Sequence, residues 1–410
     1  KILRGLALVV LATMVSLPAF IGRAQKSHDN GVNRNLTIFN SIVKELEMNY
    51  VDSINTDKSF KSAINAMLSE VDPYTIYYTP EEQKEFMAMT SGEYGGIGSY
   101  IMQRDGWTYI SGPYEGSPAA EAGLKSGDKI LRIDTLDLSG KTSDEVSSLL
   151  KGQPGTIVTV TVHRPYDADS IKTFRIERRK LQLPSVAYYG VTRDNVGYIC
   201  LTSFMDKSAD EVRVAVEELK KNPAVKSLVL DLRGNGGGIL ESAVEIVGMF
   251  VPKGTEVLRT RGRDKSTEKI YKTTKKPIWE DIPLAVLIDG GSASASEIVC
   301  GALQDMDRAV LMGQRSFGKG LVQSLMPLGY NAYAKITTAK YYIPSGRCVQ
   351  RINYSAHDGS NKEIIPDSLI REFTTRNGRK VYDGKGLMPD VKVDPEYISS
   401  FAMILYNLGY

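Results

Sequence analysis

The sequence predicts a chain of mixed α/β class, with a main domain of alternating strands and helices, a smaller β-rich insert before it, and a helical region at the start. From about residue 185 onward, strand-like and helix-like segments alternate, as in "IPLAVLIDGGSASASEIVCGALQ". Residues 88–175 instead carry short strands, glycine turns and only two short helical segments. The first pattern is typical of strand–helix–strand crossovers, and the second of a compact β-rich module.

Length and composition indicate an ordinary globular protein of several domains. A chain of 410 residues has room for two or three domains, and its 42% apolar and 24% charged residues are usual values. The net charge of +3 gives no argument for nucleic-acid binding. The most basic tract, residues 253–276, contains interspersed acidic residues and predicts a solvated loop or hairpin.

The first residues predict export. Lys1 and Arg4 precede an apolar run over residues 5–21, after which the sequence turns polar. This is typical of a secretory signal or of a short uncleaved anchor, and the run is slightly short for a membrane span. We therefore expect residues 1–24 to be a signal peptide or membrane anchor, and the rest to be periplasmic or anchored facing the periplasm.

Residues 25–81 predict a small helical region. Apolar residues recur at helical spacing over residues 33–50, at Leu36, Phe39, Val43 and Leu46. A second helix is expected near residues 58–70, followed by a turn over residues 71–82. The apolar stripe is expected either to pack inside the protein or to pair with a second copy. A homodimer is therefore one of two interpretations.

The insert over residues 82–178 resembles a PDZ domain. The resemblance rests on "GSPAAEAGLKSGDKILRID" and on "GGIG", which is Gly95, Gly96, Ile97 and Gly98. It implies that the "GGIG" loop binds a terminal carboxylate and that Val146 and Leu150, on a helix over residues 143–150, line the other wall of a peptide groove. PDZ domains add an extended peptide to a sheet edge, so the expected partners are proteins with exposed apolar C-terminal tails.

The glycine-rich turn "RGNGGG", residues 233–238, follows a predicted strand. A dinucleotide-binding fingerprint would need glycine where Ile239 stands, and no lysine of a phosphate-binding loop is present. A turn of this kind also exposes backbone N–H groups at a helix start, where they can hold an oxyanion.

Three serines alternate with alanines where another strand gives way to a helix: Ser292, Ser294 and Ser296. Ser294 and Glu297 have the spacing of a capping box, so helix capping without chemistry is one interpretation. The other is that one serine is a nucleophile, since the helix start favours developing negative charge. A nucleophile needs a base.

Lys319, between two glycines in "FGKGLVQS", is the candidate base. Desolvation lowers a lysine pKa and can leave a neutral amine, and a serine–lysine pair is a known variant of the serine–histidine arrangement. Gln323, four residues later, could orient the amine. The three histidines lie in no catalytic motif, and Cys200, Cys300 and Cys348 have neither disulfide-framework nor zinc-site spacing, so no metal or cofactor is expected.

Several motifs in order resemble the carboxy-terminal processing proteases, also called tail-specific proteases. They are "LDLRGNGGG", "GGSASASEIVCGALQD", "FGKGLVQS", "YYIPSGR" and "GLMPDV". The resemblance implies a crotonase/ClpP-like peptidase core over residues 179–410, and it implies roles for the following residues. Ser294 is the nucleophile, Lys319 the base and Gln323 its helper; the oxyanion hole is Ala295 with Gly238, or alternatively Gly237; Asp305 is structural.

The expected function is therefore that of an exported serine endopeptidase that captures C-terminal tails and cuts within them. The alternative is a non-catalytic PDZ scaffold with a degenerate protease core. An acyl-CoA enzyme of crotonase type is a further alternative, but no segment suggests an adenine-nucleotide site. If Gly238 supplies an oxyanion donor, Gly238→Ala is expected to lower kcat with little change in melting temperature.

Overall fold

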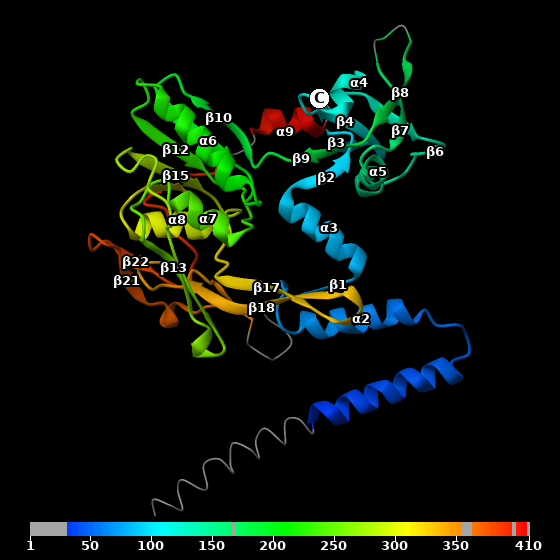
Figure 1. Ribbon diagram of the computed structural model, residues 1–410, viewed down its shortest axis with the longest axis horizontal. Helices are drawn as coiled ribbons and strands as arrows, with labels where there is room; N and C mark the ends of the chain where they lie inside the picture. The colour runs from blue at the N-terminus through cyan, green and yellow to red at the C-terminus, as the bar shows by residue number, and fades with distance from the viewer. Residues whose placement is uncertain (1–30, 166, 168, 355–362, 396–398, 408–410) are drawn as a thin grey trace, which may run out of the picture. The chain divides into compact units, whose positions relative to one another are not determined.

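The computed structural model describes residues 31–165, 167, 169–354, 363–395 and 399–407 (Figure 1). The chain divides into two compact units, Lys1–Met67 and Leu68–Tyr410. The predicted signal or anchor segment lies outside the described residues. Within the described ranges, no helix is both long and apolar enough to cross a membrane.

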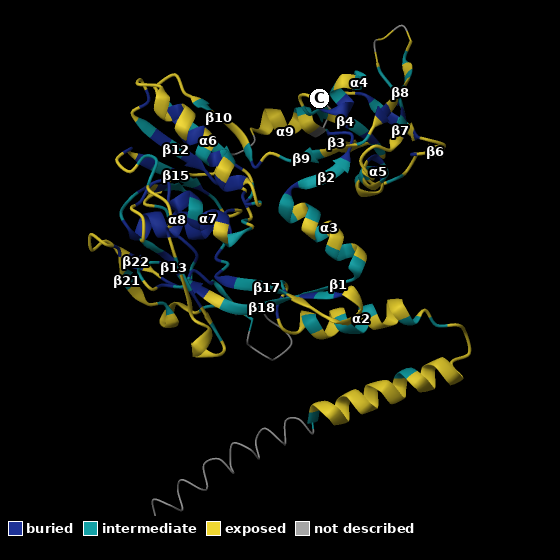
Figure 2. Ribbon diagram, viewed as in Figure 1, coloured by how far each residue is buried: buried dark blue, intermediate teal, exposed yellow. Residues whose placement is uncertain are grey.

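The first unit contains a helix over residues 31–49 and the start of α2 (Thr56–Ser69), both close to the predicted helices. Phe39 and Phe60 join the two helices edge to face, with ring centroids 5.7 Å apart. The predicted apolar stripe remains exposed, with Leu36 at 55% and Leu46 at 45% (Figure 2). Within its own unit the stripe is therefore covered only in part, with Phe39 packed on Phe60 and with Leu36 and Leu46 left exposed.

The main domain is built on a six-stranded sheet, as the alternating sequence pattern predicts. Its strands, in spatial order, are β10 (Val186–Val191), β11 (Val196–Leu201), β12 (Ser227–Asp231), β15 (Leu284–Ile288), β16 (Val310–Gly313) and β23 (Val391–Lys392). From β11 to β23 all neighbours are parallel, and β10 pairs antiparallel with β11. The carboxyl ends of β12 and β15 therefore meet at one edge, which brings the glycine-rich turn and the serine turn together.

Three helices connect these strands: α6 (Ser208–Lys221), α7 (Leu240–Val247) and α8 (Ala295–Asp305). In α6 the buried apolar side chains recur at helical spacing, and the opposite face is charged. All 11 residues of α8 are buried, so this helix lies inside the core. The N-terminus of α8, just after Ser294, is thereby held in a fixed place.

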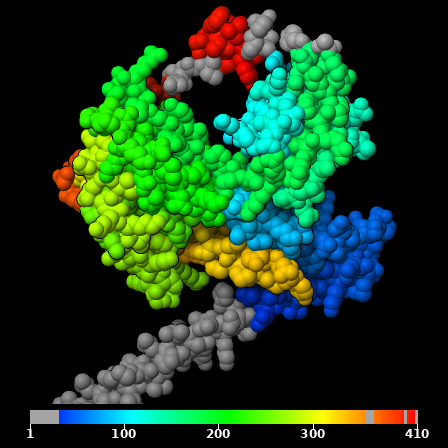
Figure 3. Space-filling model, turned by 45° about the horizontal axis from the view of Figure 1, so that its top comes forward, coloured from blue at the N-terminus to red at the C-terminus, as the bar shows by residue number. Residues whose placement is uncertain are grey.

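A second sheet of five strands lies in the same domain. It has the order β1 (Ile76–Tyr78), β18 (Tyr333–Tyr342), β13 (Glu256–Gly262) and β14 (Lys269–Lys272), and β17 (Leu321–Pro327) also pairs with β18. The predicted β17–β18 hairpin is present and reaches the surface (yellow to orange in Figure 3), with η2 (Gly329–Asn331) at its tip. The basic tract forms the β13–β14 hairpin, with η1 (Lys265–Thr267) between its strands.

The segment expected to be a turn, residues 71–82, is more ordered than predicted. It contains β1, which pairs antiparallel with β18, and the start of α3 (Pro80–Ser91). Thr79 caps α3 in a capping box with Glu82. A strand of three residues gives no clear periodicity, so only its distant partner in β18 makes it a strand.

The insert has its own sheet and core. Its strands are β3 (Ser99–Arg104), β4 (Trp107–Pro113), β5 (Lys129–Ile133), β7 (Ile157–His163) and β8 (Ile171–Glu177), with β6 (Leu136–Asp137) beside β5, and its helices are α4 (Pro118–Ala122) and α5 (Ser143–Leu150). Gly95 and Gly96 differ from the expected turn: they belong to β2 (Glu93–Gly96), which pairs with β9 (Arg179–Gln182). That partner lies beyond the insert in sequence, so local residues alone could not predict it.

Smaller elements complete the described chain. They are β19 (Ile352–Asn353) with β20 (Glu363–Ile364), β21 (Glu372–Thr374) with β22 (Lys380–Tyr382), η3 (Asp367–Leu369) and α9 (Ser400–Asn407). All three cysteines are free, and Cys300 is buried in α8.

Candidate active site

Ser294 stands at the junction of β15 and α8 in a strained backbone conformation. Its φ is 56° and its ψ is −113°, a combination that costs free energy in a residue with a side chain. Strained strand-to-helix turns of this kind present a nucleophilic serine at the edge of a sheet. Ser294 is half-buried, whereas Ser292 and Ser296 are buried, so it is the accessible member of the three.

The two flanking serines fasten the turn to the glycine-rich loop. The Ser292 hydroxyl donates to the carbonyl oxygen of Leu232 at 2.8 Å, and the Ser296 hydroxyl donates to that of Asn235, also at 2.8 Å. The alternation of serines thus has a physical reason. The hydroxyls of the outer two serines bind the glycine-rich loop, and the middle serine remains partly exposed.

The glycine-rich loop packs directly on this turn. A Cβ added to Gly237 would lie 2.8 Å from both the backbone nitrogen of Ala295 and the Cβ of Ser294. The N–H of Gly237 already donates to the Asn235 side chain at 2.9 Å. In the described part of the chain, the N–H groups of Gly238 and Ala295 donate no hydrogen bond. This favours Gly238 over Gly237 as the second oxyanion donor, a role that stays a prediction.

The prediction that Gly238→Ala changes the melting temperature little is wrong, because an added side chain has no room. Gly238 has a φ of 144°, and an added Cβ would lie 2.0 Å from the carbonyl oxygen of Phe204. A backbone contact this close cannot be relieved by turning a side chain. The variant is therefore expected to lose stability together with activity, and it cannot isolate an oxyanion role.

A buried carboxylate joins the serine turn to the lysine turn. Oε1 of Glu297 accepts hydrogen bonds from the Ser316 hydroxyl at 2.5 Å and the Gly318 N–H at 2.8 Å. Oε2 accepts the N–H groups of Ser294 at 3.0 Å and Lys319 at 2.8 Å. Burial raises the pKa of Glu297 and the hydrogen bonds oppose that rise. Since four donors fill both oxygens, the group fits here as a carboxylate. The sequence assigned Glu297 only to helix capping.

Lys319 lies on the loop between β16 and β17 and is half-buried. Burial lowers the pKa of its amine, as does the charge of Lys335, while Asp72 and Glu297 raise it. The nitrogen lies 4.2 Å from the centroid of the Tyr74 ring. Over the residues that the structure describes, this nitrogen makes neither a hydrogen bond nor an ion pair. A lysine with a lowered pKa is suited to general-base chemistry.

Gln323, on β17, lies in the same region but has a different partner. Its side-chain amide donates to the Thr337 hydroxyl on β18 at 3.1 Å. The described contacts include none between Gln323 and the Lys319 amine. Assistance of the lysine by Gln323 therefore stays a prediction.

The loop before β1 contributes residues that the sequence did not single out. The Asp72 carboxylate accepts the backbone N–H groups of Tyr74 and Thr75, at 2.7 and 2.8 Å. The Thr75 hydroxyl in turn accepts the N–H of Thr337 at 3.3 Å. The local signal, Asp72 followed by Pro73, is typical of a turn and says nothing about a distant lysine.

In the insert, the predicted peptide-binding residues differ in exposure. Gly98 has a φ of 77°, which suits a glycine between β2 and β3, and Ile97 is buried beside it. Val146 and Leu150 are exposed by only 0% and 5% and belong to the core of the insert. They therefore support α5 from inside, and contact of these residues with a peptide stays a prediction.

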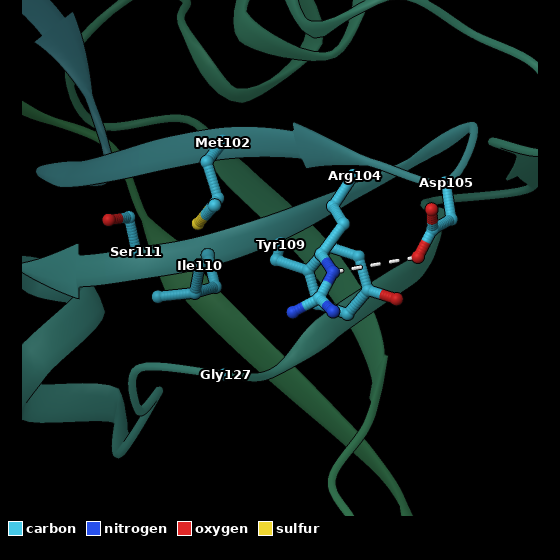
Figure 4. A pocket seen from close by; sticks show the side chains of 7 residues that line it. All are labelled: Met102, Arg104, Asp105, Tyr109, Ile110, Ser111 and Gly127. Atoms are coloured by element: carbon cyan, nitrogen blue, oxygen red, sulfur yellow. Dashed lines mark ion pairs between the residues drawn. The ribbon is translucent and has the colours of Figure 1, made fainter. Parts of the chain in front are cut away.

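A cavity of about 460 Å³ occurs elsewhere on the insert (Figure 4). Residues of β3 and β4 line most of it: Met102, Arg104, Asp105, Tyr109, Ile110, Ser111 and Gly127. None of these residues belongs to the "GGIG" segment or to α5. The cavity is thus lined in part by β3, the strand at the edge of this sheet, and not by the "GGIG" segment or by α5.

Comparison with known proteins assigns the family. Residues 195–370 match the model of peptidase family S41, and residues 109–164 match a PDZ domain model. A carboxy-terminal-processing protease of Bartonella bacilliformis is 36% identical over 84% of this chain and 77% of that protein. A probable CtpA-like serine protease of Staphylococcus aureus is 31% identical over 98% of this chain and 78% of that protein.

A solved structure supports the fold. The putative S41 protease from Bacteroides fragilis is 16% identical, has a TM-score of 0.50, and covers 85% of this chain and 86% of that chain. At this identity the likeness concerns the mixed α/β fold alone. Taken with the sequence relatives, these findings show that the chain is a serine protease of peptidase family S41, belonging with the carboxy-terminal-processing proteases and carrying a PDZ domain.

Proposed function

We propose that this protein is an exported endopeptidase that cleaves proteins near their C-termini, with Ser294 as nucleophile and Lys319 as general base. One observation carries the catalytic assignment. The buried Glu297 carboxylate accepts the backbone N–H of Ser294 and that of Lys319, at 3.0 and 2.8 Å. Two turns that are separate in sequence are thereby held next to each other, one with a strained serine and the other with a lysine of lowered pKa.

The chemistry follows from these groups. The neutral Lys319 amine accepts the hydroxyl proton of Ser294 as the oxygen attacks a peptide carbonyl. The N–H groups of Ala295 and Gly238 receive the developing oxyanion. Protonated Lys319 then gives its proton to the leaving amine. In the hydrolysis of the acyl-enzyme, Lys319 accepts a proton from the attacking water and returns it to the Ser294 oxygen as the ester bond breaks. Gln323 is proposed to orient the amine when Lys319 faces Ser294.

The PDZ domain supplies the proposed choice of substrate. Its segment over residues 95–98, of which Gly95 and Gly96 end β2, is proposed to offer backbone N–H groups for a terminal carboxylate. The edge strand β3 is proposed to pair with the extended tail. Leu150, at the end of α5, is the proposed contact for an apolar last residue. The matched relative named a carboxy-terminal-processing protease supports cleavage near the C-terminus.

Further parts of the proposal rest on sequence patterns. The run of strand–helix–strand units supports a crotonase/ClpP-like core. The apolar run over residues 5–21 supports export to the periplasm, in free or anchored form. The exposed stripe with Leu36 and Leu46 supports a homodimer through the first helix.

The test is cleavage of an unfolded protein with an apolar C-terminus, followed by mass spectrometry of the products. Wild-type protein is expected to release C-terminal fragments, and Ser294→Ala is expected to release none. Ser59→Ala, at an exposed serine on α2, is the matched control and should keep the wild-type rate. A non-catalytic scaffold would bind the tail without cutting it, so an intact substrate with wild-type protein would reject the proposal.

A further inference from the structure

The amine of Lys319 lies over the ring of Tyr74 in the described structure. The lysine nitrogen lies 4.2 Å from the ring centroid, well within the range in which an aromatic face attracts a cation. The attraction acts on the ammonium and is lost when the amine is neutral. The ring therefore favours the protonated form of Lys319, which cannot act as a base.

The ring is held in place from several sides. Asp72 fixes the backbone of Tyr74 through the N–H groups of residues 74 and 75. The ring of Tyr354 meets it edge to face with centroids 5.9 Å apart, and the two hydroxyls lie within 3.4 Å. The loop is tied to β18 through Thr75 and Thr337. Tyr74 is thus a fixed surface, and the flexible lysine side chain is the partner that can move.

Tyr74 acts here as a neutral ring. Burial raises the pKa of its phenol, and so does the hydrogen bond with Tyr354. A phenol with a raised pKa stays protonated in the range where a lysine base titrates. Tyr74 is therefore neither an ion-pair partner for Lys319 nor a competing base.

We propose that Tyr74 is a positioning residue that holds Lys319 as an ammonium in the resting enzyme. Before each attack, Lys319 gives its proton to solvent water, leaves the ring and turns to the Ser294 hydroxyl. The proposal rests on Lys319 being the general base. The loop before β1 contains neither Ser294 nor Lys319. On this proposal it nevertheless helps to set the pH at which the enzyme works.

Other charged groups near Lys319 act on the same equilibrium. Lys335, on β18, disfavours the ammonium, while Asp72, in the same loop as Tyr74, and Glu297, on α8, favour it. All three remain in a Tyr74 variant. A variant that removes only the aromatic face therefore reports the contribution of the ring.

The experiment compares the pH dependence of kcat/KM for wild type, Tyr74→Phe and Tyr74→Leu. Phenylalanine keeps the aromatic face, so its profile should coincide with wild type. Leucine keeps an apolar side chain but loses the face, so the rising limb should move to lower pH by about 0.4 to 1.5 units. The position of the limb, not its height, is the readout, because a merely structural defect lowers the plateau without moving the midpoint.

A matched control removes a similar contact elsewhere. Lys269 lies 4.4 Å from the centroid of the Tyr271 ring on β14. Tyr271→Leu should leave the midpoint where it is in wild type. A midpoint for Tyr74→Leu equal to wild type, or at higher pH, would overturn the proposal.

A second measurement does not depend on catalysis. In the Ser294→Ala background, Lys319 is labelled with dinitrofluorobenzene across a pH series, and the modified peptide is quantified by mass spectrometry. Adding Tyr74→Leu should move the labelling midpoint to lower pH by the same amount, and an unchanged midpoint overturns the role of the ring. A labelling shift without a shift in activity supports the contact with Tyr74 and rejects Lys319 as the base.

Discussion

At the scale of single residues, Lys319 is anchored through its backbone, whose N–H donates to Glu297. In the described structure its amine makes no hydrogen bond or ion pair and lies 4.2 Å from the centroid of the Tyr74 ring. Lys319→Ala is therefore expected to fold normally and to lose roughly 10²–10⁴-fold in kcat, the usual contribution of a general base. Steady-state kinetics and thermal unfolding measure the two effects. As a control, Lys269→Ala, which removes another lysine from an aromatic ring, should keep full activity. Near-normal kcat in Lys319→Ala would contradict the assignment of Lys319 as the general base.

Lys319 is also expected to set the pH dependence of kcat/KM. Only the neutral amine can accept a proton, so kcat/KM should rise with pH and level off above the pKa of Lys319. Because burial lowers that pKa, the rise should lie below the range of an exposed lysine. Initial rates at sub-saturating substrate, measured from acidic to alkaline pH, give the profile. Activity that is independent of pH, or that falls over the range where the amine loses its proton, does not fit a lysine base.

At the scale of elements, the two turns are joined through the N-terminal part of α8. Glutamine at position 297 has one oxygen in place of two, so some of the four donors face an NH₂ group. Each buried donor left without an acceptor costs about 1–3 kcal/mol. Glu297→Gln should therefore lower the free energy of unfolding by about 2 kcal/mol or more and reduce kcat more than it changes KM.

A matched control exists on α6. Glu211 also accepts two backbone N–H groups, from Ser185 at 2.7 Å and Val186 at 2.9 Å. Glu211→Gln should cost stability without a specific loss of kcat. If both variants lose activity only in proportion to their stability, Glu297 has no special part in positioning the dyad.

The elements also show what the sequence could predict. The strand–helix alternation predicted the sheet, and the small residues around Ser294 and Lys319 predicted two turns, of which the second is largely buried. The contact between Tyr74 and Lys319 depends on β1 pairing with β18, which no local pattern encodes. The contact of Gly238 with the Phe204 carbonyl was also not predicted. A glycine in the sequence does not reveal whether it is needed for an exposed N–H or because a side chain would clash.

At the scale of the whole molecule, a PDZ domain precedes a peptidase core in one chain. If the PDZ domain captures tails, a free terminal carboxylate gains charge-assisted hydrogen bonds that a carboxamide cannot fully replace. Matched peptides that end in acid or amide should therefore differ in cleavage, chiefly through KM. Replacing the last apolar residue by Asp should have the same effect. Equal kcat/KM for the acid and the amide would reject tail capture and leave the catalytic assignment untouched.

The most direct test of the central claim, that Ser294 is a nucleophile activated by Lys319, is covalent labelling with a fluorophosphonate. The reagent reacts with an activated serine, and peptide mass spectrometry locates the adduct. We expect one adduct, on Ser294, that forms quickly in wild type, slowly in Lys319→Ala, and not at all in Ser294→Ala. An adduct on Ser292 or Ser296, or equal labelling rates in wild type and Lys319→Ala, would contradict it.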